Sequence, residues 1–321
     1  MPRRLPDRPI HLRATRLLDV VKGELIEPGE LLIEGERIAE VGPTAVPADA
    51  EAIDLGDLTL LPGLMDMEVN LLLGGPDHTS PLNPVQDDPA LRTLRAVANA
   101  RRTLRSGFTT VRNLGLFVQT GGLLLDVALR KAIDLGWIDG PRVVAAGHAI
   151  SPTGGHLDPT MFQALAPHIM PLTVEEGIAD GVSQVRRAVR YQIKHGAQLI
   201  KVCASGGVMS HTGPAGAQQY SDEELRAIAD EAHRAGLRVA AHAHGDDGIR
   251  AAIEAGIDCI EHGSLMSDET LDLMIERGTF LVPTTYLADG MDASHAAPEL
   301  QAKAAEVFPR AKRTISKAIE R

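Results

Sequence analysis

Residues 198–209 read Gln-Leu-Ile-Lys-Val-Cys-Ala-Ser-Gly-Gly-Val-Met, and seven of these twelve residues are apolar. An apolar run that leads directly into a Gly-Gly pair predicts a buried strand followed by a loop. Lys201 is the single charge within this run. Because a buried ammonium costs several kcal/mol unless it is paired or neutralised, we expect Lys201 to meet a carboxylate, to lose its proton or to be chemically modified.

Two more short strands are predicted further along the chain, in residues 236–245 and 256–263. Each carries a histidine closely followed by glycine, His242 in the first strand and His262 in the second. In an α/β barrel the C-terminal ends of the strands form one face, on which active-site groups collect. We therefore predict a metal site in which Lys201, carbamylated by carbon dioxide, supplies an anionic oxygen ligand beside His242 and His262.

The composition narrows the classes of partner. The chain has 321 residues, enough for one large domain and a small one, and its formal net charge is -11. This acidic balance argues against nucleic acid or an acidic membrane as a binding partner, because both attract basic patches.

The chain has no run of ~18 apolar residues and no apolar segment after its basic start, so we expect a cytoplasmic protein. Cys203 and Cys259 lie in predicted buried strands, which favours reduced core residues over a disulfide.

Residues 1–60 differ in pattern from the rest of the chain. Short alternating segments, punctuated by glycine and proline, occur at 10–14, 30–42 and 51–55, with a tight hairpin turn predicted at 34–37. This pattern predicts a small β-sandwich part.

From residue 61 to residue 321 a unit of strand, loop and helix repeats, which predicts an α/β fold of the TIM-like (β/α)8 barrel type. The strands are expected near 64–70, 107–113, 142–148, 198–204, 237–242, 257–262 and 279–284. Helices are expected between them, including 89–106, 221–235 and one that opens at Thr173; the last two begin with a capping-box pattern. A closed barrel of this type has eight strands. Since seven are visible before a final helix at 298–321, we expect this chain to lack strand eight and the C-terminal sandwich strands.

Six motifs, taken together and in this order, resemble the amidohydrolase superfamily, in its branch of prolidase-like and imidazolonepropionase-like metal-dependent hydrolases. The motifs lie at residues 61–66, 107–112, 150–156, 200–207, 241–245 and 260–263. The resemblance covers nearly the whole chain. It implies a metal-bearing (β/α)8 barrel and a small β-sandwich that is built from both ends of the chain.

The resemblance also implies roles for individual residues. Lys201 matches the carbamylated lysine of strand four, while His242 and His262 match metal ligands of strands five and six. His156, in a Thr-Gly-Gly-His loop, matches a catalytic position that faces the substrate, although a purely loop-stabilising histidine is the alternative. The weaker substrate-facing candidates near the same loops are His148, His211 and Tyr220. His244 is expected to lie outside the ligand set, either as a residue that supports the ligands or as a loop residue.

Two departures from the family pattern carry further expectations. The superfamily's first strand ends in His-x-His, whereas this chain has Glu68 and Asn70 at those positions. A carboxylate can bind a divalent ion but an amide oxygen is a poor zinc ligand, so Glu68 is predicted to bind metal and one site to be weakened. Such pairs are similar to those of phenylurea and thiocarbamate hydrolases that look mononuclear.

The second departure is the missing aspartate of strand eight, for which Glu68 is the nominated substitute. Asp66 is instead expected to anchor the end of its strand, and the Glu261 side chain is expected to face away from the site.

The chemistry that the resemblance implies is metal-assisted hydrolysis of a C–N bond, since a divalent cation lowers the pKa of bound water from ~15.7 towards ~7. The prolidase-like branch implies an N-acyl amino acid or a dipeptide as substrate, while the altered first strand favours a non-peptide amide, a urea or a carbamate. Zinc suits two histidines and a carbamate, and Glu68 would also admit manganese or cobalt. The family implies a homo-oligomer. An alternative from another class is an inactive fragment, or a subunit that needs a second segment to complete the barrel.

Overall fold

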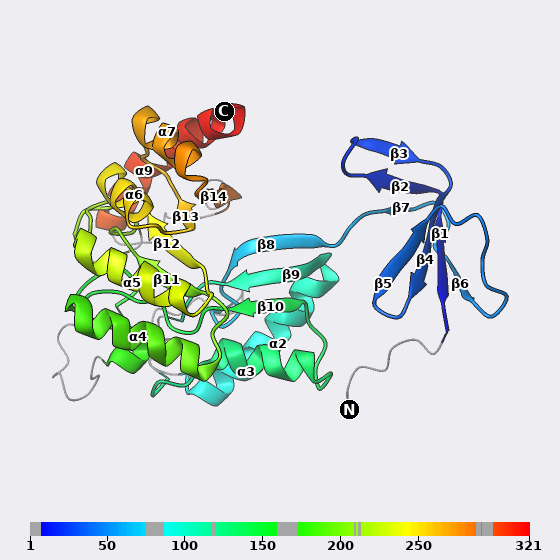
Figure 1. Ribbon diagram of the computed structural model, residues 1–321, viewed down its shortest axis with the longest axis horizontal. Coiled ribbons are helices and arrows are strands. Elements are labelled where there is room, and N and C mark those ends of the chain that lie inside the picture. The colour runs from blue at the N-terminus through cyan, green and yellow to red at the C-terminus, as the bar shows by residue number, and fades with distance from the viewer. Residues whose placement is uncertain are drawn as a thin grey trace.

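The computed structural model describes residues 8–74, 87–116, 118, 120–158, 173–208, 210, 213–286, 290 and 298–321. Its N-terminal part is a module of short strands that stands beside the rest of the molecule, and the chain passes from one to the other between β7 and β8 (Figure 1). One sheet has the order β5-β4-β1-β6, formed by Arg37–Val41, Gly29–Glu34, Ile10–Ala14 and Glu51–Asp54. A second sheet has the order β3-β2-β7, formed by Glu24–Ile26, Arg16–Asp19 and Thr59–Leu60.

The larger part contains all seven predicted strands, and they run parallel in two sheets. The first sheet is β10-β9-β8, formed by Arg142–Ala145, Phe108–Asn113 and Leu64–Val69. The second is β11-β12-β13-β14, formed by Ile200–Cys203, Val239–Ala243, Cys259–His262 and Phe280–Val282. A parallel bridge between Ile150 and Val202, and the bond from the Gln198 N–H to the Ala145 carbonyl, bring the two sheets together. The strands thus follow one another in chain order, as in a TIM-like α/β fold.

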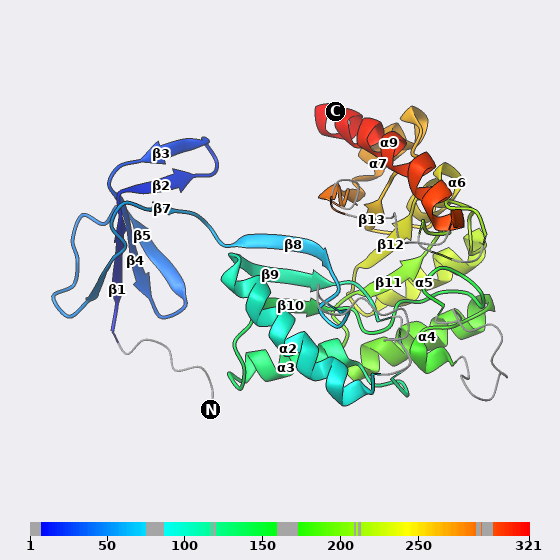
Figure 2. The ribbon, with the colours of Figure 1, turned by 180° about the vertical axis from the view of Figure 1, so that it is seen from behind.

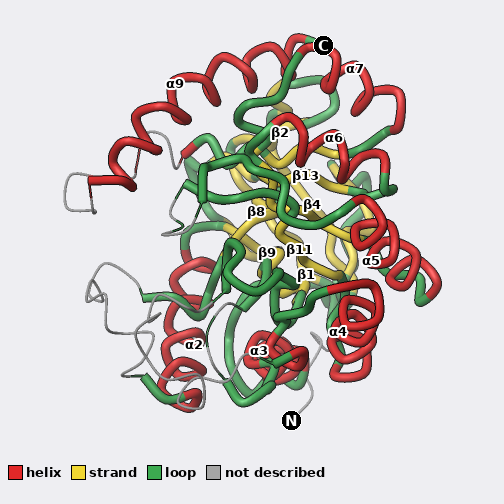
Figure 3. Tube along the Cα trace, turned by 90° about the vertical axis from the view of Figure 1, so that its left-hand side faces the viewer, coloured by secondary structure: helices red, strands yellow, loops and turns green. Residues whose placement is uncertain are grey.

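Helices alternate with these strands and lie on the outside of them (Figures 1 and 2). They are α2 Pro89–Arg105, α3 Leu125–Asp134, α4 Gly181–His195, α5 Asp222–Arg234, α6 Asp246–Glu254, α7 Asp268–Arg277 and α9 Pro298–Glu320. Viewed from the side, the strands occupy the centre and the helices surround them (Figure 3). In the described part of the chain, no helix is long and apolar enough to cross a membrane.

The predicted helix starts differ in outcome. The capping box before α5 is confirmed, since the Ser221 side chain accepts from the Glu224 N–H while the Glu224 carboxylate accepts from the Ser221 N–H. The helix predicted to open at Thr173 is wrong, because that capping pattern starts only a 3-10 turn, Val174–Glu176, and α4 begins later at Gly181. Gly177 ends the short turn in the left-handed region, with φ of 89°.

Alternation along the buried strands separates two kinds of surface. On β11, Ile200 and Val202 pack in the large core that also holds apolar residues of α4, α5 and α6. The residues between them, Lys201 and Cys203, point the other way, into the space that the strands enclose. Both cysteines are free and buried, as predicted. The strand pleat therefore places the chemistry-bearing residues on the inner face, and leaves the outer face to the helices.

Candidate metal centre

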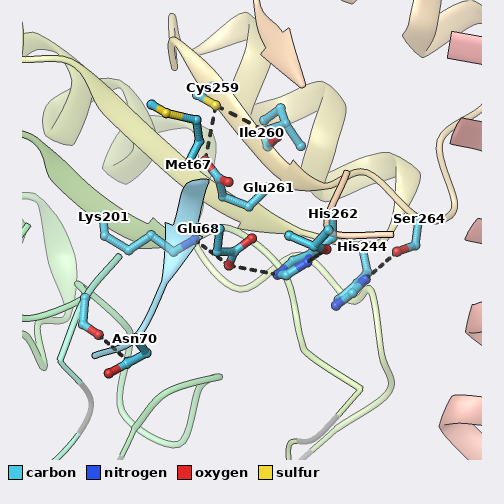
Figure 4. Close-up of polar contacts among 12 residues, drawn as sticks. Met67, Glu68, Asn70, Lys201, His244, Cys259, Ile260, Glu261, His262 and Ser264 are labelled. Carbon is cyan, nitrogen blue, oxygen red and sulfur yellow. Dashed lines mark hydrogen bonds and ion pairs between the residues drawn. The ribbon is translucent and has the colours of Figure 1, made fainter. Parts of the chain in front are cut away.

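A cavity of about 560 Å³ opens where the parallel strands end. Its lining includes Lys201 from within β11, and His242, His262 and Glu68 from the last two residues of β12, β13 and β8. Residues that are far apart in the sequence therefore meet at one point, as the strand-end rule predicted. Figure 4 shows Lys201, Glu68 and His262 directed toward one another, with His244 beside His262 and joined to Ser264.

Three histidines form the centre of this site. Ligand atoms of His242, His244 and His262 all lie within 4.8 Å of one another, and all three side chains are buried. The Nδ1 atom of His262 is 2.7 Å from Thr284 Oγ1, and that of His244 is 2.8 Å from Ser264 Oγ. These hydroxyls orient the two rings and leave each Nε2 for another partner. The Nε2 of His242 is buried without any hydrogen-bond partner.

The electrostatics of the three rings favour uncharged imidazoles. Burial lowers the pKa of His242, His244 and His262 well below the ordinary value, and the charges of neighbouring groups lower it further. Neutral imidazole is the form that binds a metal ion. The three rings are therefore held in the protonation state of ligands, and together they could hold a metal ion.

His244 is the residue that sequence reasoning missed. It was expected to support the ligands or to belong to a loop. It does follow the end of β12, but its ring is also stacked on that of His262, with centroids 4.7 Å apart, while its role toward a metal stays a prediction. The His-Ala-His spacing already contained the information, because residues i and i+2 of a strand face the same side. Because β12 continues to Ala243, that strand geometry carries His244 to the same side as His242.

Lys201 and Glu68 complete the group. The Lys201 side chain is 2% exposed, and its Nζ is buried without a hydrogen-bond partner, 4.0 Å from Glu68 Oε1. The same Glu68 oxygen is 3.5 Å from His262 Nε2, while its second oxygen, Oε2, has no partner. Burial raises the pKa of Glu68, against the opposing positive charges of Lys201 and Arg112. The structure brings the four predicted metal residues, Lys201, His242, His262 and Glu68, into one cluster, while their roles stay predictions.

Glu261 corrects one expectation. We expected its side chain to face away from the site, but it is fully buried on the inner side and Oε1 accepts from the Arg112 guanidinium at 2.6 Å. The reason is the backbone of the next residue, because His262 has φ of 73°, in the left-handed region. This turn breaks the strand alternation, so that Glu261 and His262 both face inward.

The two other residues of the altered first strand have separate contacts. Asn70 donates through Nδ2 to the Gly115 carbonyl at 3.0 Å, and its Oδ1 is buried without a partner. Asp66 accepts from the Glu68 N–H at 3.0 Å, which is the strand-end contact expected of it. Both side chains line the cavity. The Glu68 and Asn70 pair thus faces the site at the position where the family pattern has two histidines.

The predicted substrate-facing residues are placed very differently. His156 lines the cavity, with its ring centroid 3.9 Å from that of His242. Tyr220 instead lies in the large core, where its hydroxyl donates to the Ala179 carbonyl at 2.8 Å. His148 is buried beside the loop before α3, with Nε2 2.9 Å from Thr120 Oγ1. His211 lies outside the described residues.

Comparison with known proteins identifies the family of this chain. A model of the amidohydrolase family matches residues 59–320. Ochratoxinase of Aspergillus niger is 39% identical over 250 residues, which are 74% of this chain and 50% of that protein. The chain thus spans about half the length of this curated relative.

Two solved structures cover nearly the whole chain. One is a Xaa-Pro dipeptidase with bound methionine in the active site, 35% identical, with a TM-score of 0.87 over 97% of this chain and 77% of that one. The other is a prolidase complexed with N-methylphosphonate-L-proline, 36% identical, with a TM-score of 0.85 over 97% of this chain and 76% of that one. Because the family model matches more than half of the sequence, the predicted resemblance is confirmed and this chain belongs to the amidohydrolase family.

Proposed function

We propose that this protein is a metal-dependent hydrolase that cleaves a C–N bond, of amide or peptide type, in a small substrate. The observation that carries the proposal is the convergence of three neutral histidines, a buried lysine and a buried glutamate on one cavity. Membership of the amidohydrolase family supports the same reaction class.

The residues present fit a divalent cation. Buried polar atoms without partners are costly, and four of them belong to residues that line this cavity: His242 Nε2, Glu68 Oε2, Lys201 Nζ and Asn70 Oδ1. His262 and His244 each have the second ring nitrogen fixed by a hydroxyl, which is the usual support of a metal-binding histidine. A set of imidazole and carboxylate donors suits zinc and also admits manganese or cobalt. We propose that His242, His262 and Glu68 hold the ion, with His244 beside them.

Lys201 is proposed to act as a carbamate. Its Nζ lies 4.0 Å from Glu68, so a carbamate there would place two anions side by side in a buried site. Such an arrangement is stable only with a cation between the two groups, because burial of uncompensated charge is very costly. Carbamylation and metal binding at this site are therefore expected to depend on each other.

When bound, the divalent cation supplies Lewis acidity and lowers the pKa of water. The chain's own residues supply the rest. Glu68, which has one free carboxylate oxygen, is proposed to receive a proton from the attacking water. His156, which lines the cavity with its ring against that of His242, is proposed to contact the substrate. The apolar lining, which includes Leu73, Leu114 and Val208, would hold an apolar part of the substrate and exclude water from it.

The favoured substrates are an N-acyl amino acid or a dipeptide, because the solved relatives include a Xaa-Pro dipeptidase and a prolidase. One observation favours a second candidate, the hydrolysis of non-peptide amides, ureas or carbamates. Within the described lining of the cavity, Lys201 is the one cationic side chain of the lysine or arginine type, and a carbamate would remove its charge. A substrate without a carboxylate would need no such partner.

The test begins with elemental analysis of protein purified without chelators or added metal. We compare the wild type with Lys201→Ala, and with Lys194→Ala as a matched control, because Lys194 is exposed in the last turn of α4. The wild type and the control should carry about one ion per chain, and Lys201→Ala should lose it. All three proteins are then assayed on Xaa-Pro dipeptides, N-acyl amino acids and phenylureas.

Three outcomes separate the alternatives. Hydrolysis of peptide-like substrates that stops on chelation supports the main proposal, and hydrolysis of ureas alone supports the second candidate. A folded wild type without metal would refute the proposal that this chain is a metal-dependent hydrolase. That last result would leave the inactive fragment, or a subunit that needs a second segment.

A further inference from the structure

We infer that Ser210 is a positioning residue, which holds the His156 imidazole as its Nε2–H tautomer, so that this ring donates a hydrogen bond into the cavity. The tautomer stands on geometry alone, whereas the use of the donor, toward an oxygen of the substrate, rests on the proposed function. Three features fix the His156 residue: the close neighbours of its ring, the hydrogen bonds of its main chain and the contact of its Nδ1 atom with Ser210.

Two close neighbours confine the ring of His156. The His242 ring lies at a centroid distance of 3.9 Å and an angle of 32°. Gly207 also approaches the ring closely, since a Cβ atom at that position would overlap Cε1, Nδ1 and Nε2 of the imidazole. Glycine is therefore required at position 207 for close approach of its backbone to the ring, whatever turn the loop makes. The ring cannot flip or swing without displacing one of these neighbours.

The main chain of His156 is anchored independently. Its N–H donates to Gln219 Oε1 at 3.1 Å, and its carbonyl accepts from the Ser151 hydroxyl. These bonds come from segments that follow β11 and precede the loop of His156. The main chain of His156 is thus held in place as well as its imidazole ring.

Ser210 fixes the edge of the ring. Its Oγ is 2.6 Å from His156 Nδ1, and the serine is only 8% exposed. The Ser210 carbonyl accepts from Lys303 Nζ at 2.7 Å, so that α9 anchors the residue from outside. The same helix packs Ala304 and Val307 against Val208. The position of the hydroxyl is therefore set by the fold and not by the histidine alone.

The hydrogen-bonding pattern selects the tautomer. A serine hydroxyl carries one proton that needs an acceptor, and among the described residues His156 Nδ1 is the partner within reach of Ser210 Oγ. If Nδ1 carried the ring proton instead, the hydroxyl proton would be left in a buried place without an acceptor, which is costly. The hydroxyl therefore donates to Nδ1, and the ring proton lies on Nε2.

The consequence is a neutral donor at the cavity wall. Because Nδ1 accepts the proton of the Ser210 hydroxyl and the ring proton lies on Nε2, the imidazole is uncharged. A preorganised N–H directed at an oxygen on which charge develops is an effective form of catalytic stabilisation. Ser210 acts through His156 and has no contact of its own with the proposed metal residues.

Nitrogen NMR of protein labelled at the histidine imidazoles tests the tautomer directly on the wild type, with Ser210→Ala, Ser210→Thr and the exposed-site control Ser183→Ala beside it. We expect the Nε2–H pattern for His156 in the wild type, in Ser210→Thr and in the control. Ser210→Ala should show a mixture of tautomers or a shifted Nδ1 signal. With active protein, kcat of Ser210→Ala should fall by roughly 10- to 100-fold with little change in KM, less than the loss of a whole donor.

The results separate the two levels of the argument. An Nδ1–H tautomer in the wild type, or an unchanged His156 signal in Ser210→Ala, overturns the inference whatever the enzyme does. An Nε2–H tautomer that depends on Ser210, in a protein without hydrolase activity, supports the positioning and refutes only the proposed function. Equal loss of kcat in Ser210→Thr and Ser210→Ala would also overturn it, because threonine keeps the hydroxyl.

Discussion

Replacing Arg112 by methionine is expected to lower the free energy of unfolding by about 3–5 kcal/mol. Arg112 extends from β9, where it is 11% exposed, and donates to the fully buried Glu261 of β13 at 2.6 Å. Its Nε also donates to the Met67 carbonyl of β8 at 2.6 Å. One guanidinium thus joins three strands across the inner space. Methionine keeps an apolar stem but leaves the buried Glu261 carboxylate without the counter-charge to which it is hydrogen-bonded, which is the costly event.

A double-mutant cycle isolates this cause from simple loss of packing. Glu261→Gln removes the charge and keeps the shape, so the combined variant lacks the uncompensated carboxylate. The double variant should therefore be less destabilised than the sum of the single variants, with a coupling energy of about 1–3 kcal/mol. Urea unfolding followed by far-UV circular dichroism gives each free energy through the midpoint and the m value.

A surface ion pair of the same type supplies the control. Arg8 and Glu51 are 3.2 Å apart, but their side chains are 57% and 48% exposed. Arg8→Met should cost no more than ~1 kcal/mol, because solvent screens exposed pairs. The reasoning is refuted if Arg112→Met costs no more than Arg8→Met, or if the cycle shows a coupling energy below ~0.5 kcal/mol.

Two further predictions concern stability. Ser221→Ala removes the capping box of α5 and should cost about 1 kcal/mol in urea unfolding; an unchanged midpoint would mean that the cap is not used in solution. His148 is buried with its pKa lowered to about 4, so between pH 6.5 and pH 4 the unfolded chain binds a proton that the folded chain does not. Stability is therefore lost as the pH falls through this window, at ~1.36 kcal/mol per pH unit for this group. His148→Gln should reduce the slope by that amount, and an equal slope in both proteins would contradict the assignment.

Much of the fold could be predicted from the pattern of apolar and polar residues and from the glycine and proline residues that lie between the elements. The seven parallel strands were located by apolar runs, because buried strands of such sheets are apolar on both faces. The N-terminal strands Arg16–Asp19 and Glu24–Ile26 were not predicted, since they are short and partly exposed and show no clear period. Short exposed strands are defined by pairing with distant partners, which a local pattern does not contain.

The site was predicted where chemistry coincides with a strand end. Lys201, His242 and His262 met this condition, and the structure brings them together. Tyr220 is not brought to the cavity. It was chosen because it is close in sequence to the loops that follow the strands, but in the structure its hydroxyl donates to the Ala179 carbonyl in the core. Glu261 was assigned to the wrong face, because alternation assumes regular φ and ψ angles at every residue. A single left-handed residue is enough to invalidate that assumption.

The left-handed backbone at His262 places two demands on one position. The residue must adopt φ of 73° and must also present an imidazole to its neighbours. Glycine and asparagine adopt this backbone with less strain, but neither carries an imidazole. A change that relaxed the backbone would therefore remove the candidate ligand. At position 262, a residue that lowers the backbone strain would remove the imidazole. A histidine here is therefore expected only where its side chain is needed for function.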